Sequence, residues 1–480
     1  EFYEMRVLKP EHAKAHRNGD IHIHDLDFLT LTTTCCQIDL IQLFQHGFST
    51  GHGFLREPND IRSYAALACI AIQSNQNDQH GGQSVPNFDY AMAGGVKKTY
   101  RKRYLQNVAR ALELLTDIEE PQAFVKSYAA AIQQETGLIP CLANNNGYQE
   151  AEAQKLSERL TADQIATIQA FAKKNAYRET NRATYQAMEA LIHNLNTMNS
   201  RAGAQTPFSS INYGTDTTPE GRMVIENVLL AEEAGLGNGE TPIFPIHIFK
   251  VKEGVNYNKE DPNYDMFKLA CRVSAKRLFP NFAFLDAPYN LQYYKPGDYR
   301  TEIAYMGCRT RVIGNEYDPT REIVTGRGNL SFTSINLPRL AIKANGDIDK
   351  FFTLLNNMMD LTIEQLTDRF AIQCQKKVRN YPFLMGQGVW LDSEGLGPDD
   401  SVAEVLKHGT LSVGFIGLAE TLKALIGKHH GESAEAQELG LKIIQTMRDR
   451  TDLESKKTGL NFSVLATPAE GLSGRFVRMD

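Results

Sequence analysis

Short runs rich in β-branched and aromatic residues alternate with helical periodicity along this whole chain, and this alternation limits its fold more than any other feature. The β-type runs lie at residues 20–27, 206–213, 241–250, 330–337 and 410–418. Apolar residues recur at helical spacing between them, most clearly at residues 164–172 and 185–193. Strands that alternate with helices pack as a sheet covered by helices. The sequence therefore predicts an α/β fold, either a barrel or a doubly wound sheet.

The bulk composition is that of a soluble globular enzyme. The chain has 480 residues, of which 42% are hydrophobic and 22% are charged, and no repeat or low-complexity tract divides it. The formal net charge of −6 argues against a general nucleic-acid-binding surface. No apolar run approaches the ~20 residues that a membrane-spanning helix needs. We therefore expect one catalytic domain over residues 1–480, with no nucleic-acid or membrane partner.

The seven cysteines do not form a recognisable framework. They are Cys35, Cys36, Cys69, Cys141, Cys271, Cys308 and Cys374. Their number is odd, they are scattered, and no two are spaced as C-x-x-C, so disulfides and a zinc ribbon are both disfavoured. This usage is typical of a reducing compartment, and the cytoplasm is the expected location.

Cys308 stands out among the cysteines because of its neighbours. Gly307 before it allows a tight backbone turn, and Arg309 and Arg311 after it could hold an anion or favour the thiolate. A cysteine presented in this way can be a reactive thiol at a loop tip. Free cysteine is also among the most buried residue types. The local sequence leaves these two interpretations balanced.

An adjacent pair, Cys35 and Cys36, follows the β-branched run at residues 32–34. Such a run suits a strand, in which consecutive side chains point to opposite faces. Only one of the two thiols can then face a given cavity. Because a pair of buried small hydrophobic residues is the commoner outcome, the local sequence favours a structural role.

Three polar runs that contain glycine are further candidates for a binding site. Asn329 follows a flexible turn, where its amide could bind a sugar hydroxyl or a carboxylate, or simply its own backbone. Residues 409–414 precede a helical pattern and could offer N–H groups to a phosphate, although helix capping by Thr410 or Ser412 explains them nearly as well. The loop at residues 77–84 could line a site or be a plain turn.

His22 and His24 indicate a different chemistry. They would share one face of a strand, and two histidines so arranged are a good metal-ligand pair. A metal-dependent hydrolase would need further ligands, for which His193 and His247 are the nominees. No second motif supports them, and hydrogen-bonded structural histidines are the commoner case.

Taken together, several of these runs resemble the catalytic subunit of the anaerobic (class III) ribonucleoside-triphosphate reductases, which are glycyl-radical enzymes. The matching segments are residues 22–27, 32–39, 75–84, 200–209, 235–250, 306–310, 326–337 and 410–420. They follow in order across nearly the whole chain, so the resemblance is far more specific than any single motif.

The resemblance implies a ten-stranded α/β barrel of two five-stranded parallel halves, with a central finger loop that carries Cys308. It implies that Cys308 becomes the thiyl radical that abstracts the ribose 3′-hydrogen and that Cys35, with Cys36 as the less secure choice, assists reduction at the 2′-carbon. Asn329 would help to hold the ribonucleoside triphosphate and formate. Formate is the expected reductant, in preference to a thioredoxin. The implied substrate-binding residues are Gly409, Thr410, Ser412, Gly414, Gly81, Gly82 and Gln83.

The family also uses components that these residues do not supply. Its radical glycine lies near the C-terminus beside a four-cysteine zinc site, and a radical-SAM iron–sulfur activase generates the radical. Gly314 lies in a similar run but follows Cys308 too closely to approach it as a separate segment. We therefore expect the glycyl-radical and zinc region beyond Asp480, and no metal site within the chain. A regulatory nucleotide-binding cone, frequent at the N-terminus in this family, is not represented in the chain, and ATP or deoxynucleotide effectors and a homodimer are further implications.

Three other functions stay open at this point. One is the metal-dependent hydrolase that uses His22 and His24, which bound metal at these residues would favour. The second is another glycyl-radical enzyme of the lyase type, which would share the barrel and the cysteine but differ in its pocket. The third is a nucleotide sensor without catalytic activity, built on a reductase-like barrel.

Overall fold

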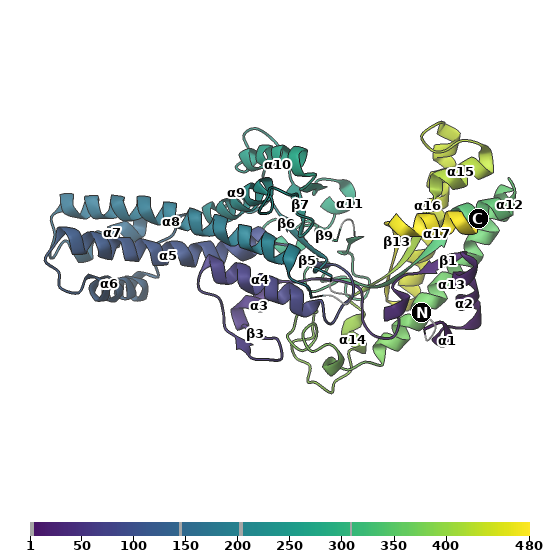
Figure 1. Cartoon of the computed structure of the whole chain (residues 1–480), viewed down its shortest axis with the longest axis horizontal. Coiled ribbons are helices and arrows are strands. Elements are labelled where there is room, and N and C mark those ends of the chain that lie inside the picture. The colour runs from purple at the N-terminus through teal and green to yellow at the C-terminus, as the bar shows by residue number, and fades with distance from the viewer. Residues whose placement is uncertain (1–3, 144–145, 201–204, 308–309) are drawn as a thin grey trace.

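The computed structural model describes residues 4–143, 146–200, 205–307 and 310–480, and it contains two main β-sheets (Figure 1). The first sheet has five strands, all parallel, in the order β2-β5-β6-β7-β8. These strands are β2 (Cys36–Gln37), β5 (Gln83–Val85), β6 (Ser209–Tyr213), β7 (Ile246–Val251) and β8 (Asn281–Phe284). This sheet agrees with the five-stranded parallel half that the resemblance implies, and β6 and β7 confirm two of the predicted β-type runs.

The second sheet differs from that expectation. Its strands are β1 (Ile21–Ile23), β11 (Asn329–Asn336), β12 (Thr410–Ile416) and β13 (Asn461–Ala466), in that order. As described, it has four strands instead of five, and β1 runs antiparallel to β11. The alternation of Ile21, His22 and Ile23 determines which face each side chain takes, but a strand of either direction satisfies it. The prediction of a second five-stranded parallel half was therefore wrong for the described residues.

The two sheets meet along one seam. The Cys35 N–H donates to the Asn329 carbonyl at 3.1 Å, and the Gln37 N–H donates to the Arg327 carbonyl at 2.9 Å. No backbone hydrogen bond joins the opposite edge strands, β8 and β13, within the part of the chain that the structure describes. The result is an α/β fold whose sheets are joined on one side, without a barrel closed by hydrogen bonds.

Each sheet has one apolar face and one polar face. In β12, Leu411 and Val413 enter the main hydrophobic core, whereas Ser412 bonds to the Ser463 hydroxyl on the other face at 2.9 Å. In β6, Ile211 lies in the core and Asn212 lies on the opposite face. Helices cover the apolar faces, for example α13 (Ile348–Cys374) on the second sheet and α5 (Phe88–Leu115) on the first. The polar faces are therefore the surfaces left for a site.

A helical arm extends away from the sheets, at the left of Figure 1. It consists of the outer parts of α5 and α8 (Ala162–Thr197) with α6 (Pro121–Thr136) and α7 (Asn146–Leu156), and it has its own hydrophobic core. Glu152 is buried within it and accepts hydrogen bonds from the Tyr104 and Tyr128 hydroxyls, both at 2.7 Å. The two predicted helical segments at residues 164–172 and 185–193 are parts of the single 36-residue helix α8.

The remaining elements connect and cover these sheets. They are α1 (Glu4–Val7), α2 (Pro10–Asn18), α3 (Leu40–His46), β3 (Phe48–Ser49), β4 (Phe54–Leu55), α4 (Ile61–Asn75), α9 (Pro219–Ala234), α10 (Tyr264–Arg277), α11 (Pro288–Leu291), β9 (Tyr305–Met306), β10 (Thr310–Arg311), α12 (Leu337–Ala344), α14 (Ala403–Leu406), α15 (Leu418–Ile426), α16 (Ala434–Thr458) and α17 (Glu470–Met479), with short 3₁₀ turns at Leu26–Phe28, Tyr299–Thr301 and Val378–Asn380. Among the described residues, none of these helices combines the length and apolar character needed to cross a membrane.

Candidate active site

A short hairpin formed by β9 and β10 lies against the polar face of the first sheet. Met306 pairs with Thr310, and Cys308 and Arg309, between the two strands, lie outside the described residues. The Tyr305 carbonyl accepts hydrogen bonds from the Asn212 amide at 3.0 Å and from the Ser84 hydroxyl at 2.9 Å, and the Tyr305 N–H donates to Asn212 Oδ1 at 2.9 Å. Side chains of two strands therefore hold the backbone of the hairpin, which we call the finger hairpin (residues 305–311).

Asn212→Ala should loosen this hairpin measurably. The substitution removes both hydrogen bonds between Asn212 and Tyr305 and leaves only hydroxyl donors such as Ser84 on the Tyr305 carbonyl, which should cost about 1–3 kcal/mol of unfolding free energy. Chemical denaturation of the variant and the wild type measures this difference. Asn238→Ala, at an exposed loop position, is the control and should change the unfolding free energy by less than about 0.5 kcal/mol. Equal losses for the two variants would contradict the anchoring role of Asn212.

The structure separates the two adjacent cysteines. Cys35 lies in a small apolar cluster with Met306 and Val312, on either side of the finger hairpin's tip, whereas Cys36 is fully buried in the main core. Burial raises the pKa of Cys35 to about 12 and raises the pKa of Cys36 well above its usual value. Both groups are therefore neutral thiols near pH 7, and Cys35 is the one that faces the finger hairpin.

Asn329 lies directly beside Cys35. Its backbone carbonyl accepts the Cys35 N–H at 3.1 Å, and it pairs in register with Thr410 of β12. Asn329 Oδ1 and Thr410 Oγ1 are both buried, and neither makes a hydrogen bond. Because buried polar atoms are nearly always paired, two such oxygens next to a thiol fit a polar ligand that can donate hydrogen bonds, such as a polyol.

The glycines around this site allow segments to approach one another closely. A Cβ on Gly328 would lie 1.8 Å from the Cys35 carbonyl oxygen, and a Cβ on Gly81 would lie 2.6 Å from the Thr34 carbonyl oxygen. Gly82 faces the backbone of Gly307, with an added Cβ 3.3 Å from its nitrogen. Gly81 and Gly82 therefore hold their loop against the seam and the finger hairpin, which is a packing role.

The Gln83 side chain, which the resemblance assigns to substrate binding, points away from the finger hairpin. It is fully buried, its Oε1 accepts a hydrogen bond from the Asn75 amide of α4, and its Nε2 donates to the Gly81 carbonyl at 3.3 Å. Since alternate residues of β5 face opposite sides of the sheet, Ser84 points to the finger hairpin and Gln83 does not. This geometry assigns Gln83 to loop positioning and gives no support to its predicted contact with a substrate.

The other predicted binding residues lie along a strand and not at a helix start. Gly409 precedes β12, and Thr410, Ser412 and Gly414 belong to it, whereas α15 begins only at Leu418. A Cβ on Gly414 would lie 2.2 Å from Thr467 Oγ1 and 2.4 Å from Ser334 Oγ. The glycine therefore makes room for these hydroxyls at the carboxyl end of the sheet, where α17 follows β13.

Arg327 is a functional candidate that the sequence did not reveal. Its guanidinium is fully buried and donates to the carbonyls of Ile313 (2.7 Å), Gly314 (2.8 Å) and His408 (2.9 Å). Burial lowers the pKa of Arg327 to about 9. This side chain fixes the segment that follows the finger hairpin, and only the tertiary structure brings its acceptors together.

Arg311 does not support the prediction that arginines hold an anion beside Cys308. Its guanidinium donates to the Tyr289 carbonyl at 3.1 Å and to the Asn290 side chain, and it lies over the Tyr289 ring. Its charge is therefore used to hold α11 to the stem of the finger. The other arginine of the prediction, Arg309, lies outside the described residues.

The histidines that suggested a hydrolase are not arranged as metal ligands. Nδ1 of His22 bonds to the Arg475 guanidinium at 2.8 Å, and Nε2 of His24 bonds to the Ser334 hydroxyl at 2.8 Å. Burial lowers the pKa of both rings, to about 4 for His22 and about 3 for His24. His247 bonds to the Tyr213 hydroxyl in the other sheet. A guanidinium at the ring of His22 repels a cation, so the geometry argues against the hydrolase.

The comparison with known families identifies the family of this chain. A family model described as anaerobic ribonucleoside-triphosphate reductase matches residues 1–480. The chain belongs to this family. The finger hairpin, Cys35 and Asn329 are thus elements of a reductase-family chain, and the resemblance seen in the sequence is confirmed.

Individual relatives agree with this assignment. The anaerobic ribonucleoside-triphosphate reductase of Escherichia coli (strain K12) is 29% identical over 100% of this chain and 59% of that protein. The protein of the same name from Enterobacteria phage T4 is also 29% identical, over 97% of this chain and 66% of its own length. This chain therefore spans about three fifths to two thirds of these relatives.

A solved structure shows the same fold. The anaerobic ribonucleotide reductase of Thermotoga maritima, crystallised with dATP in the specificity site, superposes with a TM-score of 0.63 at 15% identity. The match covers 100% of this chain and 69% of that one.

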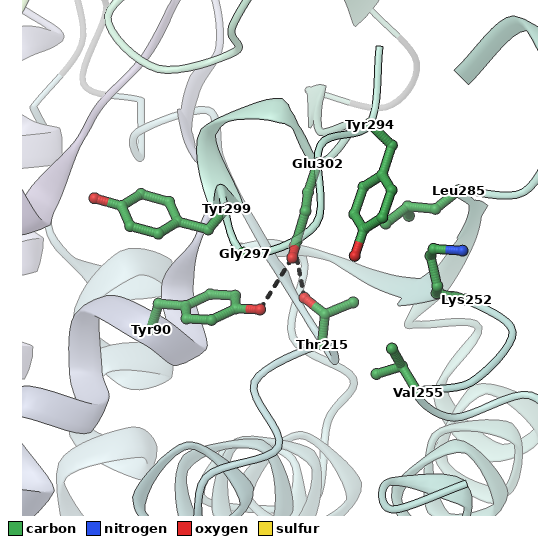
Figure 2. Close-up of a pocket in the computed structure, with 9 residues that line it drawn as sticks. All are labelled: Tyr90, Thr215, Lys252, Val255, Leu285, Tyr294, Gly297, Tyr299 and Glu302. Atoms are coloured by element: carbon green, nitrogen blue, oxygen red, sulfur yellow. Dashed lines mark hydrogen bonds between the residues drawn. The ribbon is translucent and has the colours of Figure 1, made fainter. Parts of the chain in front are cut away.

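The finger of the reductase-family chain is also held at its base, where a cavity of about 130 Å³ lies at the carboxyl ends of β6 and β7 (Figure 2). Glu302, which precedes the finger hairpin, accepts hydrogen bonds from Thr215 Oγ1 at 2.6 Å and from the Tyr90 hydroxyl at 2.9 Å. The buried Lys250 ammonium lies 3.1 Å from the same carboxylate. This ion pair connects the stem of the finger to the sheet, and the cavity shares no residue with the Cys35–Asn329 site.

Proposed function

We propose that this chain is the catalytic core of an enzyme that reduces ribonucleoside triphosphates to 2′-deoxyribonucleoside triphosphates by radical chemistry without oxygen. One observation carries the proposal: in a chain of this family, Cys35 faces the finger hairpin beside the unpaired Asn329 oxygen. A buried thiol and a polar anchor next to the segment that contains Cys308 are what such a reaction needs. The sheets would form the two halves of a barrel around the finger.

The roles of the three residues follow from their chemistry. The sulfur of Cys308, as a thiyl radical, would take the hydrogen atom from the ribose 3′-carbon and return it to the product at the end. The Cys35 thiol would give a hydrogen atom to the 2′-carbon once the 2′-hydroxyl has left as water, and formate would return a hydrogen atom to the Cys35 sulfur. Formate, oxidised to carbon dioxide, would supply the two electrons, and Asn329 would accept a hydrogen bond from a ribose hydroxyl. A closed cavity protects the radical from solvent.

The polar face of the second sheet supports a binding mode for the nucleotide. Thr410 lies beside Asn329, whereas Gly414, Ser334 and Thr467 lie at the carboxyl end of the strands. Four residues of strand separate the two ends by about 13 Å. The ribose would thus contact the Thr410 end of β12, and the phosphates would contact the hydroxyls at the Gly414 end. At that end α17 follows β13, and the N-terminus of a helix favours anions.

Other components belong to the same proposal. Among the described residues, the cysteines do not gather into a metal-binding group, so they do not fit the family's four-cysteine zinc site. We place that zinc and the radical glycine in a segment beyond Asp480, activated by a radical-SAM iron–sulfur enzyme. Control by ATP and deoxynucleotide effectors is supported by the Thermotoga maritima relative with dATP in its specificity site. A homodimer is proposed as well.

An anaerobic assay of the complete protein tests the proposal. It would contain a radical-SAM activase, S-adenosylmethionine, a ribonucleoside triphosphate and formate, and it would measure deoxynucleotide and carbon dioxide. Equal amounts of the two products would support the full scheme. If deoxynucleotide forms only with a thiol reductant, the reductant is a thiol and not formate. If protein with an established glycyl radical forms no deoxynucleotide, the proposed function is rejected.

A further inference from the structure

Helices α2 and α13, close together at the right of Figure 1, bring together three metal-binding side chains that do not belong to the proposed active site. Glu11 and His12 lie on α2 and Glu364 lies on α13. One ligand atom from each lies within 4.8 Å of the others, and among the described residues no other set of three does so. Acidic groups alone are an ordinary surface feature, so the evidence for a metal site depends on His12.

His12 is a buried ring without hydrogen-bond partners. Its side chain is 1% exposed, and neither ring nitrogen makes a hydrogen bond. Nε2 lies 3.7 Å from Glu364 Oε2, and Nδ1 lies 3.8 Å from Asp368 Oδ2. Both distances are too long for a hydrogen bond. Two atoms bound to one tetrahedral zinc ion, at about 2.0–2.2 Å each, lie about 3.4 Å apart. The gap between Nε2 and Glu364 is thus close to the span of a bound ion.

The charges around this ring also leave room for a cation. Glu11, Glu364 and Asp368 carry three negative charges, and Lys9 supplies one positive charge from 2.5 Å to Glu364 Oε1 and 3.0 Å to Asp368 Oδ2. Lys9 therefore binds the Glu364 oxygen that does not face His12. Two negative charges remain, which a divalent cation would balance.

We propose that Glu11, His12 and Glu364 bind one zinc ion, with water in the fourth position. Asp368, at the other ring nitrogen, orients the imidazole, as carboxylates commonly do behind a metal-bound histidine. The ion ties α2 to α13 and so fixes the helix that leads into β1. The site is independent of the proposed reductase chemistry and distinct from the zinc placed beyond Asp480.

Zinc titration of the complete, chelator-stripped protein against a chromophoric competitor tests the site. Wild type should bind one more equivalent than the Glu11→Gln/Glu364→Gln double variant, and its melting temperature should rise with zinc more than that of the variant. Both substitutions are at exposed positions and keep the side-chain size. Glu438→Gln, an exposed residue of α16, should bind zinc like the wild type.

Two further variants separate the site from a plain ion-pair cluster. Asp368→Asn should weaken zinc binding by about 10–100-fold. Lys9→Met should strengthen it, because a competing positive charge is removed. Equal zinc content and affinity in the wild type and the double variant would overturn the proposal, as would weaker zinc binding in Lys9→Met.

Discussion

Cys308→Ala should reduce deoxynucleotide formation by at least about 10⁴-fold, because it removes the thiol that we propose takes the ribose hydrogen and returns it. The residue lies outside the described part of the structure, but Tyr305 of β9, the strand that pairs with β10, is held by Asn212 and Ser84. These anchors use backbone groups of Tyr305, so alanine at position 308 leaves them intact. Binding of the ribonucleoside triphosphate should therefore change by less than about threefold.

The assay compares turnover and equilibrium binding in the same preparation, after the glycyl radical has been quantified by EPR. Cys271→Ala is the matched control, because Cys271 is an exposed cysteine of α10. It should retain wild-type turnover. Normal turnover in Cys308→Ala, with the radical present, would reject the assignment of the hydrogen-atom carrier.

Cys35→Ala and Cys36→Ala should have opposite effects, although the two residues are adjacent. Cys35 lies in a small apolar cluster with Met306 and Val312, so its loss should abolish deoxynucleotide formation and cost less unfolding free energy than the loss of Cys36. Cys36 is fully buried in the main core, so its loss should leave the chemistry intact and cost about 1–3 kcal/mol of unfolding free energy. Turnover and chemical denaturation of both variants measure this contrast.

The pH dependence gives a second reading of the same pair. Burial raises the pKa of Cys35 to about 12, so the thiol remains protonated and able to donate hydrogen throughout the neutral range. Ionisation of the Cys35 thiol should therefore cause no loss of turnover between pH 7 and about pH 9. Loss of activity in Cys36→Ala with normal turnover in Cys35→Ala would reverse the assignment.

Much of the fold could be predicted because the longer strands carry a readable pattern. Strands β11 and β12 have eight and seven residues, enough for the alternation between core and polar face to repeat. Strands β2 and β5 have two and three residues, too few for any period to appear, and their pairing depends on neighbours far away in the sequence. The antiparallel direction of β1 could not be read from its alternation either.

The candidate site could be predicted only where the role of a side chain does not depend on residues that are distant in the sequence. Alternation along a strand predicts that Cys35 and Cys36 face opposite sides, but the choice between them requires the position of the finger hairpin. Arg327 and Asn212 carry no local signal for their roles at the finger, since Gly314 and Tyr305, which they bind, lie 13 and 93 residues away. Arg311, close to Cys308 in the sequence, was predicted to hold an anion, but its guanidinium donates to the Tyr289 carbonyl of α11.

We propose that a hydrogen atom moves from the ribose 3′-carbon to the Cys308 sulfur at the Cys35–Asn329 site. The most direct test is competition between 3′-deuterated and unlabelled ribonucleoside triphosphate, using the complete activated protein without oxygen. The account predicts that the unlabelled substrate is reduced faster and that Cys308→Ala reduces neither. Equal rates for the two substrates, or deoxynucleotide formed by Cys308→Ala at the wild-type rate, would contradict it.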